Sequence, residues 1–289
     1  MFVGDIMLSR GITKQIEKYQ DNRYPFLKIA STTQSADLTF GNLEGPISSR
    51  GRNQGSIYSF RAKPEAVEGL KFAGFDILSL VNNHIWDWGK EALEDTIDIL
   101  KENEIEPVGI DRNYEEANAP VIFEINLQTS DIPKINDNIR MSDVQRLNWD
   151  IGSPKIESYI TKIAFLAYTN LYPNSFKANG NSAGISDFDI EKIKNEIKYL
   201  KESQTADIVV ISFHWGEEYQ TRSNKTQQNI AHGLIEAGAD LIVGHHPHII
   251  QEIEQYQDCW IAYSLGNFVF DQSFSEETMR SLIDRKSVV

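Results

Sequence analysis

Three histidines within four residues, placed directly after a short apolar run, constrain this chain more than any other feature. Leu241 to Val243 is predicted to be a buried strand, and Gly244 ends it. The histidines that follow are His245, His246 and His248. Their imidazoles are therefore expected at the C-terminal end of a strand, the edge where ligands bind in an open α/β sheet. Neutral imidazoles on one rigid loop are natural ligands for a divalent transition metal.

The composition is that of a globular protein and argues against nucleic-acid binding and against a membrane-spanning protein. The chain has 289 residues, of which 40% are hydrophobic and 24% charged. Its net charge of −14 repels a phosphate backbone, so nucleic acid is not expected as a partner. No stretch reaches the roughly 20 apolar residues of a membrane span, and no signal peptide is recognisable. The single cysteine, Cys259, excludes an internal disulfide and a thiolate metal site.

Both ends of the sequence look cut. Met1 to Val3 is too short for a complete buried strand, so we expect a further segment before it. Arg280 to Val289 contains no clear closing element, and we expect a further segment there as well.

Ligand-type side chains also follow other predicted strands. They are Asp5 after residues 1–3, Glu44 after 37–40, Asn83 and His84 after 75–81, and His214 after 207–213. Because parallel strands present their C-terminal ends at one edge of a sheet, we expect these side chains to lie near the histidine loop. Each one alone also fits an ordinary turn, and a lone histidine after an apolar strand is more often a core residue.

The sequence Asn82-Asn83-His84 fits a metal ligand with an acid beside it. The alternative is an asparagine-rich turn that caps the next helix, predicted over Lys90 to Asn103. Asp87 precedes that helix and is assigned mainly to capping, whereas His84 is assigned to chemistry.

Strands and helices alternate through most of the chain. Further helices are predicted over residues 11–19, 64–74, 187–201 and 224–237. The alternation predicts a largely parallel sheet covered on both faces, in one α/β domain over residues 1–289. Residues 127–158 are polar and lack a sustained period, which predicts an insertion between the strands 120–125 and 162–168. It is either a surface excursion or a lid over the site.

Six motifs, in this order, resemble those of the CapA family of poly-γ-glutamate capsule biosynthesis proteins, within the calcineurin-like metallophosphoesterase superfamily. They are Val3-Gly4-Asp5-Ile6-Met7-Leu8, Gly41-Asn42-Leu43-Glu44, Asn82-Asn83-His84 with Asp87 and Gly89, His214-Trp215-Gly216 with Glu218-Tyr219, Gly244-His245-His246-Pro247-His248, and Tyr263-Ser264-Leu265-Gly266-Asn267-Phe268. The resemblance covers nearly the whole chain.

The resemblance implies a four-layer α/β/β/α sandwich with metal ligands on loops at the strand ends. The implied ligands of one or two divalent ions (Mn, Fe or Zn) are Asp5, Glu44, Asn83, His214, His245, His246 and His248. His84 is the implied proton donor. The resemblance leaves open whether His245 or His246 is a ligand.

Two positions depart from the superfamily pattern. The first motif normally supplies an aspartate and a histidine two residues apart, whereas Asp5 is followed by Ile6 and Met7. Glu44 stands where a phosphoesterase more often carries aspartate. These departures put a two-metal phosphatase site in doubt and leave a one-metal or altered site as the alternative.

Three functions are compatible with the sequence. The preferred one, implied by the resemblance, is capsule or exopolymer biosynthesis: the protein acts on or holds an anionic envelope polymer, outside the cytoplasm and beside membrane-bound synthesis partners. The second is a metal-dependent hydrolase acting on a phosphorylated small molecule. The third is a polymer-binding scaffold with a vestigial site. Metal content and turnover of an aryl phosphate discriminate among them.

Overall fold

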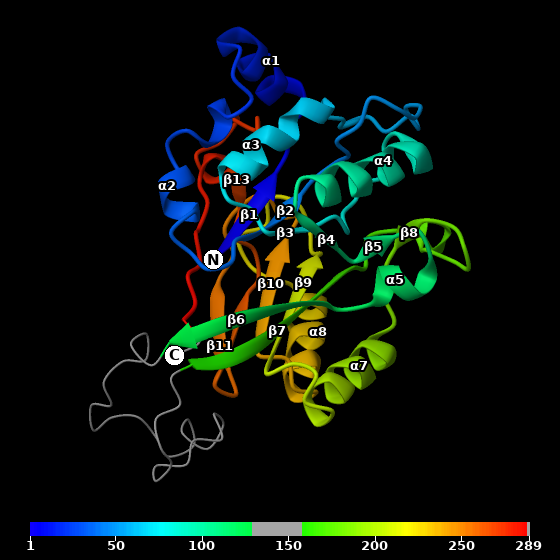
Figure 1. Cartoon of the computed structure of the whole chain (residues 1–289), viewed down its shortest axis with the longest axis vertical. Coiled ribbons are helices and arrows are strands. Elements are labelled where there is room, and N and C mark those ends of the chain that lie inside the picture. The colour runs from blue at the N-terminus through cyan, green and yellow to red at the C-terminus, as the bar shows by residue number, and fades with distance from the viewer. Residues whose placement is uncertain (129–157, 288–289) are drawn as a thin grey trace.

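The structure is a computed structural model that describes residues 1–128 and 158–287 (Figure 1). Most of the predicted insertion, residues 129–157, lies outside the described residues. Its predicted boundaries fall inside strands, because Leu127 belongs to β6 and Ser158 to β7. Within the described ranges, no helix combines the length and apolarity needed to cross a bilayer.

The first sheet has five strands in the order β13-β1-β2-β3-β4, and all neighbours are parallel. The strands are β1 (Phe2–Ile6), β2 (Phe40–Leu43), β3 (Ile77–Ser79), β4 (Glu106–Val108) and β13 (Asn267–Val269). The helices of this half are α1 (Arg10–Tyr19), α2 (Ala30–Thr33), α3 (Val67–Phe72) and α4 (Gly89–Glu102). Leu70 of α3 and Leu93 of α4 join the core of this sheet.

The second sheet has six strands in the order β11-β12-β10-β9-β7-β6. They are β6 (Val121–Gln128), β7 (Ser158–Thr169), β9 (Ile208–His214), β10 (Leu241–His245), β11 (Ile253–Tyr256) and β12 (Cys259–Ala262). The four central strands are parallel, and β6 and β11 join antiparallel at the edges. Helices α7 (Ile190–Glu202) and α8 (Lys225–Glu236) pack on this sheet through Ile197 and Leu234, which share an apolar cluster with Ile211 of β9.

Local sequence explains where these two helices begin. The carboxylate of Asp189 accepts hydrogen bonds from backbone N–H groups in the first turn of α7. Asn224 and Gln227 form a capping box at the start of α8. The remaining elements are β5 (Ile110–Asp111), β8 (Gly184–Ile185), α5 (Tyr114–Asn118) and the 3-10 turns Tyr24–Phe26, Pro64–Ala66, Asn174–Phe176 and Glu277–Met279.

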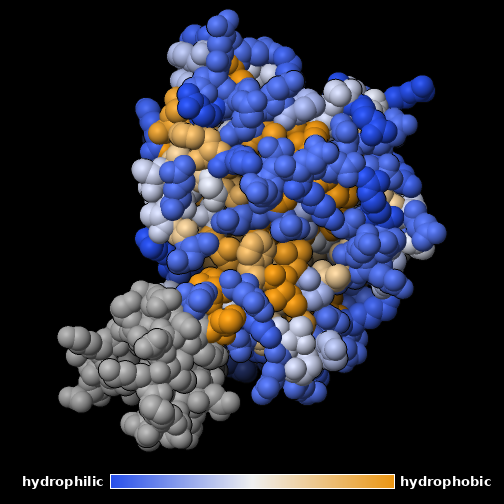
Figure 2. Space-filling view, in the orientation of Figure 1, coloured by the Kyte–Doolittle hydropathy of each residue, from blue (hydrophilic) through white to orange (hydrophobic). Residues whose placement is uncertain are grey.

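The two sheets pack face to face. Phe40 of the first sheet stacks on Phe165 of the second, with ring centroids 5.7 Å apart, and Phe2 lies 6.5 Å from the same ring. Helices cover the outer faces, as the upper and lower parts of Figure 1 show. The expected four-layer α/β/β/α architecture is therefore confirmed. Figure 2 shows that this side of the molecule is largely hydrophilic over the helices and that apolar residues gather near its centre.

Strand register brings the ligand-type residues to one edge of the sandwich. In the first sheet, Asp5 is paired with Asn42 on one side and Asn267 on the other. In the second sheet, His214 is paired with His245. The C-terminal ends of both sets of parallel strands therefore meet at a single seam.

Candidate metal centre

Asp5 lies at the centre of the seam and is fully buried. Its carboxylate accepts hydrogen bonds from the side-chain amide of Asn42 at 2.9 Å and from the backbone N–H of His246 at 3.2 Å. Nδ1 of His245 and Nδ1 of His248 each lie 3.4 Å from one of its oxygens. Burial opposes ionisation, but these two imidazoles hold the pKa of Asp5 well below its usual value. Asp5 is thus a carboxylate held as an anion.

Glu44 is buried beside Asp5, and neither of its carboxylate oxygens has a hydrogen-bond partner within residues 1–128 and 158–287. The nearest basic nitrogens are Nε2 of His248 at 3.6 Å and Nε2 of His84 at 3.7 Å. Burial, reinforced by the charge of Asp5, raises the pKa of Glu44 to about 7. One oxygen each of Asp5 and Glu44 and one nitrogen of His248 lie within 4.8 Å of one another. A buried carboxylate without donors is costly, and a bound cation offsets that cost.

The histidine loop holds His246 and His248 in unusual backbone conformations. Their φ angles are 98° and 59°, in the left-handed region that non-glycine residues rarely adopt. Such conformations cost about 1–3 kcal/mol each and cluster at functional sites. Nδ1 of His248 lies 3.0 Å from the amide oxygen of Asn267, which leaves Nε2 facing Glu44. Burial lowers the pKa of His248, but the charges of Glu44 and Asp5 outweigh it and raise that pKa to about 9.

His214 and Asn83 form the second side of the centre. Nε2 of His214 lies 2.7 Å from the amide oxygen of Asn83, and Nδ1 lies 3.4 Å from the amide nitrogen of Asn42. The ring of His246 lies 4.8 Å from that of His214 between centroids. Burial and neighbouring imidazoles hold the pKa of His214 well below its usual value and lower that of His246 to about 4. Both imidazoles are therefore neutral, the form that binds a metal.

His245 and His246 face different surroundings. His245 belongs to β10, is buried between the sheets, and lies 6.3 Å from the ring of Phe40. His246 lies beyond the strand end and shares a group of donor atoms with Glu218 and His248. The geometry therefore favours His246 over His245 as a ligand.

His84 lies at the rim of the centre in an ordered hydrogen-bond chain. Its Nδ1 donates to Asp87 Oδ2 at 2.7 Å, and its ring stacks on Phe60 at 3.9 Å between centroids. The backbone N–H of Phe60 donates to the same oxygen at 2.7 Å. The prediction that Asp87 caps the next helix is wrong, because α4 begins after Trp88 without a side-chain cap. Asp87 instead orients His84, whose Nε2 faces Glu44.

All seven sequence-predicted ligands and His84 lie at or next to this seam, with His245 turned between the sheets. Sequence reasoning missed four residues there: Asn42, Asp87, Glu218 and Asn267. Each belongs to one of the six motifs. The partners of Asn42, Glu218 and Asn267 come from other motifs, whereas Asp87 contacts His84 three positions away. The sixth histidine, His232, lies elsewhere and pairs with Glu254 while stacking on Tyr256.

The donor set fits a divalent transition metal. In addition to the oxygens of Glu44, Nδ1 of His246 is buried without a hydrogen-bond partner among the described residues. Native proteins rarely leave such groups unsatisfied. Imidazole nitrogens combined with carboxylate oxygens suit Mn, Fe or Zn.

Changing His248 to alanine is expected to abolish most metal binding. The substitution removes a ligand candidate that contacts both Asp5 and Glu44. Elemental analysis of the purified proteins measures bound metal per chain. His232→Ala, which removes a histidine paired only at the surface with Glu254, is the matched control and keeps the wild-type content. Equal metal content in His248→Ala and wild type, with unchanged circular dichroism, would remove His248 from the centre.

The structure thus defines an α/β/β/α sandwich with a cluster of histidine and carboxylate side chains at one edge of both sheets. A sequence model described as bacterial capsule synthesis protein (PGA_cap) matches residues 1–136 and 155–272. The chain therefore belongs to the bacterial capsule synthesis protein family.

Individual relatives agree with this assignment. The capsule biosynthesis protein CapA of Bacillus anthracis is 29% identical over 287 residues, covering 97% of this chain and 62% of that protein. The PGA biosynthesis protein CapA of Bacillus subtilis (strain 168) is 30% identical over 285 residues, covering 98% and 66%. The chain thus spans less than two thirds of the length of these relatives. A crystal structure of the calcineurin-like phosphoesterase YfkN from Bacillus subtilis is similar with a TM-score of 0.43 and 15% identity, covering 85% of this chain and 83% of that one.

Proposed function

We propose that this chain is the metal-binding domain, over residues 1–289, of a protein that synthesises or handles an anionic envelope polymer of the poly-γ-glutamate type. Family membership supports the pathway, since the two Bacillus relatives are named for capsule and PGA biosynthesis. The observation that carries the proposal is the buried carboxylate of Glu44, which accepts no hydrogen bond from the described residues and lies between the imidazoles of His84 and His248. The protein acts at the cell envelope, outside the cytoplasm, with membrane-bound synthesis partners.

The residues that would hold one or two divalent ions are Asp5, Glu44, Asn83, His214, His246 and His248. A bound ion would supply positive charge to neutralise and orient an anionic group. Asn42 and Asn267 position the ligands, because they hydrogen-bond Asp5 and His248, respectively.

Binding of poly-γ-glutamate is expected to require the metal. With a net charge of −14, the chain repels a polyanion on average, and a bound cation would supply local attraction. Equilibrium dialysis against the polymer, with protein loaded with Mn²⁺ or stripped by chelation, measures the affinity. We expect tighter binding with Mn²⁺ and the same loss of affinity in His248→Ala as after chelation.

His232→Ala and a neutral polysaccharide serve as controls for fold and for non-specific retention. Binding of equal strength in the loaded, stripped and His248→Ala proteins would contradict a role of the metal in polymer recognition. Metal binding without any polymer binding would contradict the polymer as the ligand and favour the second function below.

The second candidate function is hydrolysis of a phosphoester, and the pair His84–Asp87 specifically favours it. Nδ1 of His84 donates its hydrogen bond to Asp87. Nε2, which faces Glu44, is therefore the nitrogen that could transfer a proton to a substrate. Asp87 accepts the hydrogen bond of Nδ1 and so fixes the tautomer of His84, and Phe60 stacks on the ring and fixes its plane. This geometry supports His84 as the group that protonates a leaving oxygen. A metal-loaded protein without turnover of an aryl phosphate would instead be the polymer-binding scaffold.

A further inference from the structure

The first motif supplies one ligand-type residue fewer than the superfamily pattern described above. Asp5 reaches the centre, but the residue two positions later is Met7. Met7 is fully buried, and its sulfur accepts hydrogen bonds from the backbone N–H of Ser9 at 3.1 Å and from its hydroxyl at 2.9 Å. The donor that a histidine at this position would bring is therefore missing from this strand.

A glutamate from the second sheet lies beside the centre. Glu218 belongs to the loop after β9, and hydrogen bonds tie this loop to the histidine loop on both sides of it. The N–H of Trp215 donates to the carbonyl of His245 at 3.1 Å, and the N–H of Tyr219 donates to the carbonyl of Pro247 at 2.9 Å. Glu218 is therefore held in register with the histidine loop.

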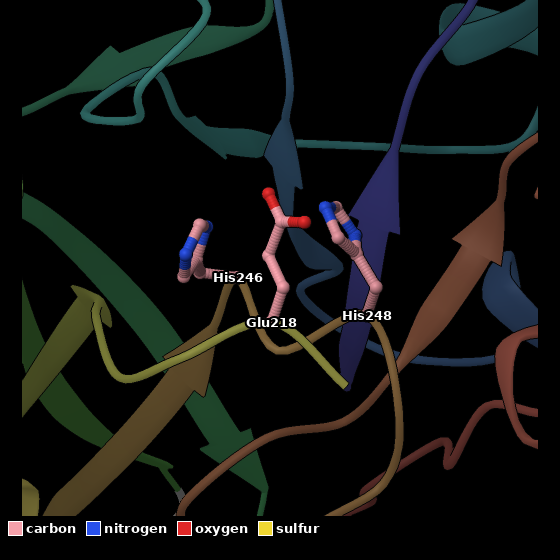
Figure 3. Close-up of side chains that lie close together, drawn as sticks. All are labelled: Glu218, His246 and His248. Atoms are coloured by element: carbon pink, nitrogen blue, oxygen red, sulfur yellow. The ribbon is translucent and has the colours of Figure 1, made fainter. Parts of the chain in front are cut away.

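The side chain of Glu218 joins two histidines as a group of donors. One carboxylate oxygen of Glu218 and one nitrogen each of His246 and His248 lie within 4.8 Å of one another. Figure 3 shows the carboxylate between the two imidazoles, which come from the neighbouring loop. Nδ1 of His246 is buried without a hydrogen-bond partner in the described part of the chain. Because buried polar atoms are rarely left unsatisfied, this is an independent argument for a ligand on this side of the centre.

We propose that Glu218 is a metal ligand, which binds the ion together with His246 and His248 and replaces the donor missing at Met7. The assignment deepens the proposed function and rests on it. Glu218 is exposed while His246 and His248 are buried, so it closes the centre from the solvent side. Two imidazole nitrogens and one carboxylate oxygen suit Mn, Fe or Zn better than Mg or Ca, which prefer oxygen alone.

The test compares Glu218→Gln with Glu217→Gln. Both substitutions remove one negative charge from neighbouring exposed positions, but only Glu218 shares donors with the histidines. Protein stripped by chelation is titrated with Mn²⁺ or Zn²⁺ in a calorimeter, and far-UV circular dichroism checks the fold. We expect Glu218→Gln to bind at least about tenfold more weakly than wild type, because even outer partners of ligands contribute 10- to 100-fold. Glu217→Gln is expected to bind like wild type.

The outcomes separate this assignment from the metal centre as a whole. Wild-type affinity in Glu218→Gln, together with loss of binding in His248→Ala, overturns Glu218 as a ligand and leaves the centre intact. Equal weakening in Glu218→Gln and Glu217→Gln also overturns it, because the effect is then one of net charge. Absence of binding by the wild-type protein overturns both proposals.

Discussion

Replacing His84 with asparagine is expected to slow hydrolysis of an aryl phosphate by roughly 10² to 10⁴, the usual contribution of general acid–base catalysis. Asparagine keeps a polar side chain but cannot deliver a proton from the position of Nε2, which faces Glu44 in this structure. Metal content should stay at the wild-type level, because His84 shares no donor group with the other histidines in the described ranges. Initial rates with metal-loaded protein provide the measurement.

A series of leaving groups separates proton donation from positioning. Phenols of low pKa leave without protonation, so the loss in His84→Asn should shrink as the leaving group improves. Asp87→Asn should show the same trend with a smaller loss, because it weakens the partner of Nδ1 at 2.7 Å without removing the imidazole. A loss of equal size across the series would show that His84 positions the substrate or holds the ion.

Replacing Gly4 with alanine is expected to destabilise the fold by about 3 kcal/mol or more, in the range of severe overpacking. A Cβ atom at this position would lie 1.8 Å from the carbonyl oxygen of Gly266 and 2.8 Å from its carbonyl carbon. Both are backbone atoms, so relief requires β1 and the segment leading into β13 to separate. Urea unfolding, followed by circular dichroism, measures the free energy difference.

Gly233→Ala is the matched control for this substitution. Gly233 lies within α8, and a Cβ atom there would meet only the end of the Lys194 side chain, at 3.3 Å. Alanine should therefore leave the stability unchanged or raise it by about 0.5–1 kcal/mol, because it favours helix more than glycine does. Equal stability of Gly4→Ala and wild type would show that the two strands are less closely packed than described.

Apolar runs and helix signals predicted most of the fold. The long strand over residues 207–213 and the helices after Asp189 and Asn224 form where expected, because strong periodicity coincides with good caps. Strand lengths were less predictable. β1 extends over Phe2–Ile6 because Asp5 and Ile6 pair with both neighbours, and β3 is limited to Ile77–Ser79. Pairing with neighbouring strands sets where each strand ends, and this pairing cannot be read from a single sequence. The extent of the domain over residues 1–289 stays a prediction.

The clustering of ligand-type residues was predictable wherever such a residue ends a strand, whereas their role as ligands stays a prediction. The choice between His245 and His246 was not, since it depends on where β10 stops. The strand continues to His245, which turns that imidazole between the sheets and leaves His246 as the first residue of the loop. The role of Asn42 was not predictable for a similar reason. Its hydrogen bond to Asp5, 37 positions away, depends on the register of β2 against β1.

The two flanking neighbours of β1 come from opposite ends of the chain, β2 from near the beginning and β13 from near the end. During synthesis on the ribosome, the first strand therefore leaves the exit tunnel long before one of its partners exists. The histidine loop is also synthesised much later than Asp5, because His246, whose N–H donates a hydrogen bond to the Asp5 carboxylate, lies 241 positions further along the chain. The candidate centre is therefore complete only after β13 and the histidine loop have been synthesised, so its residues assemble late relative to the synthesis of β1.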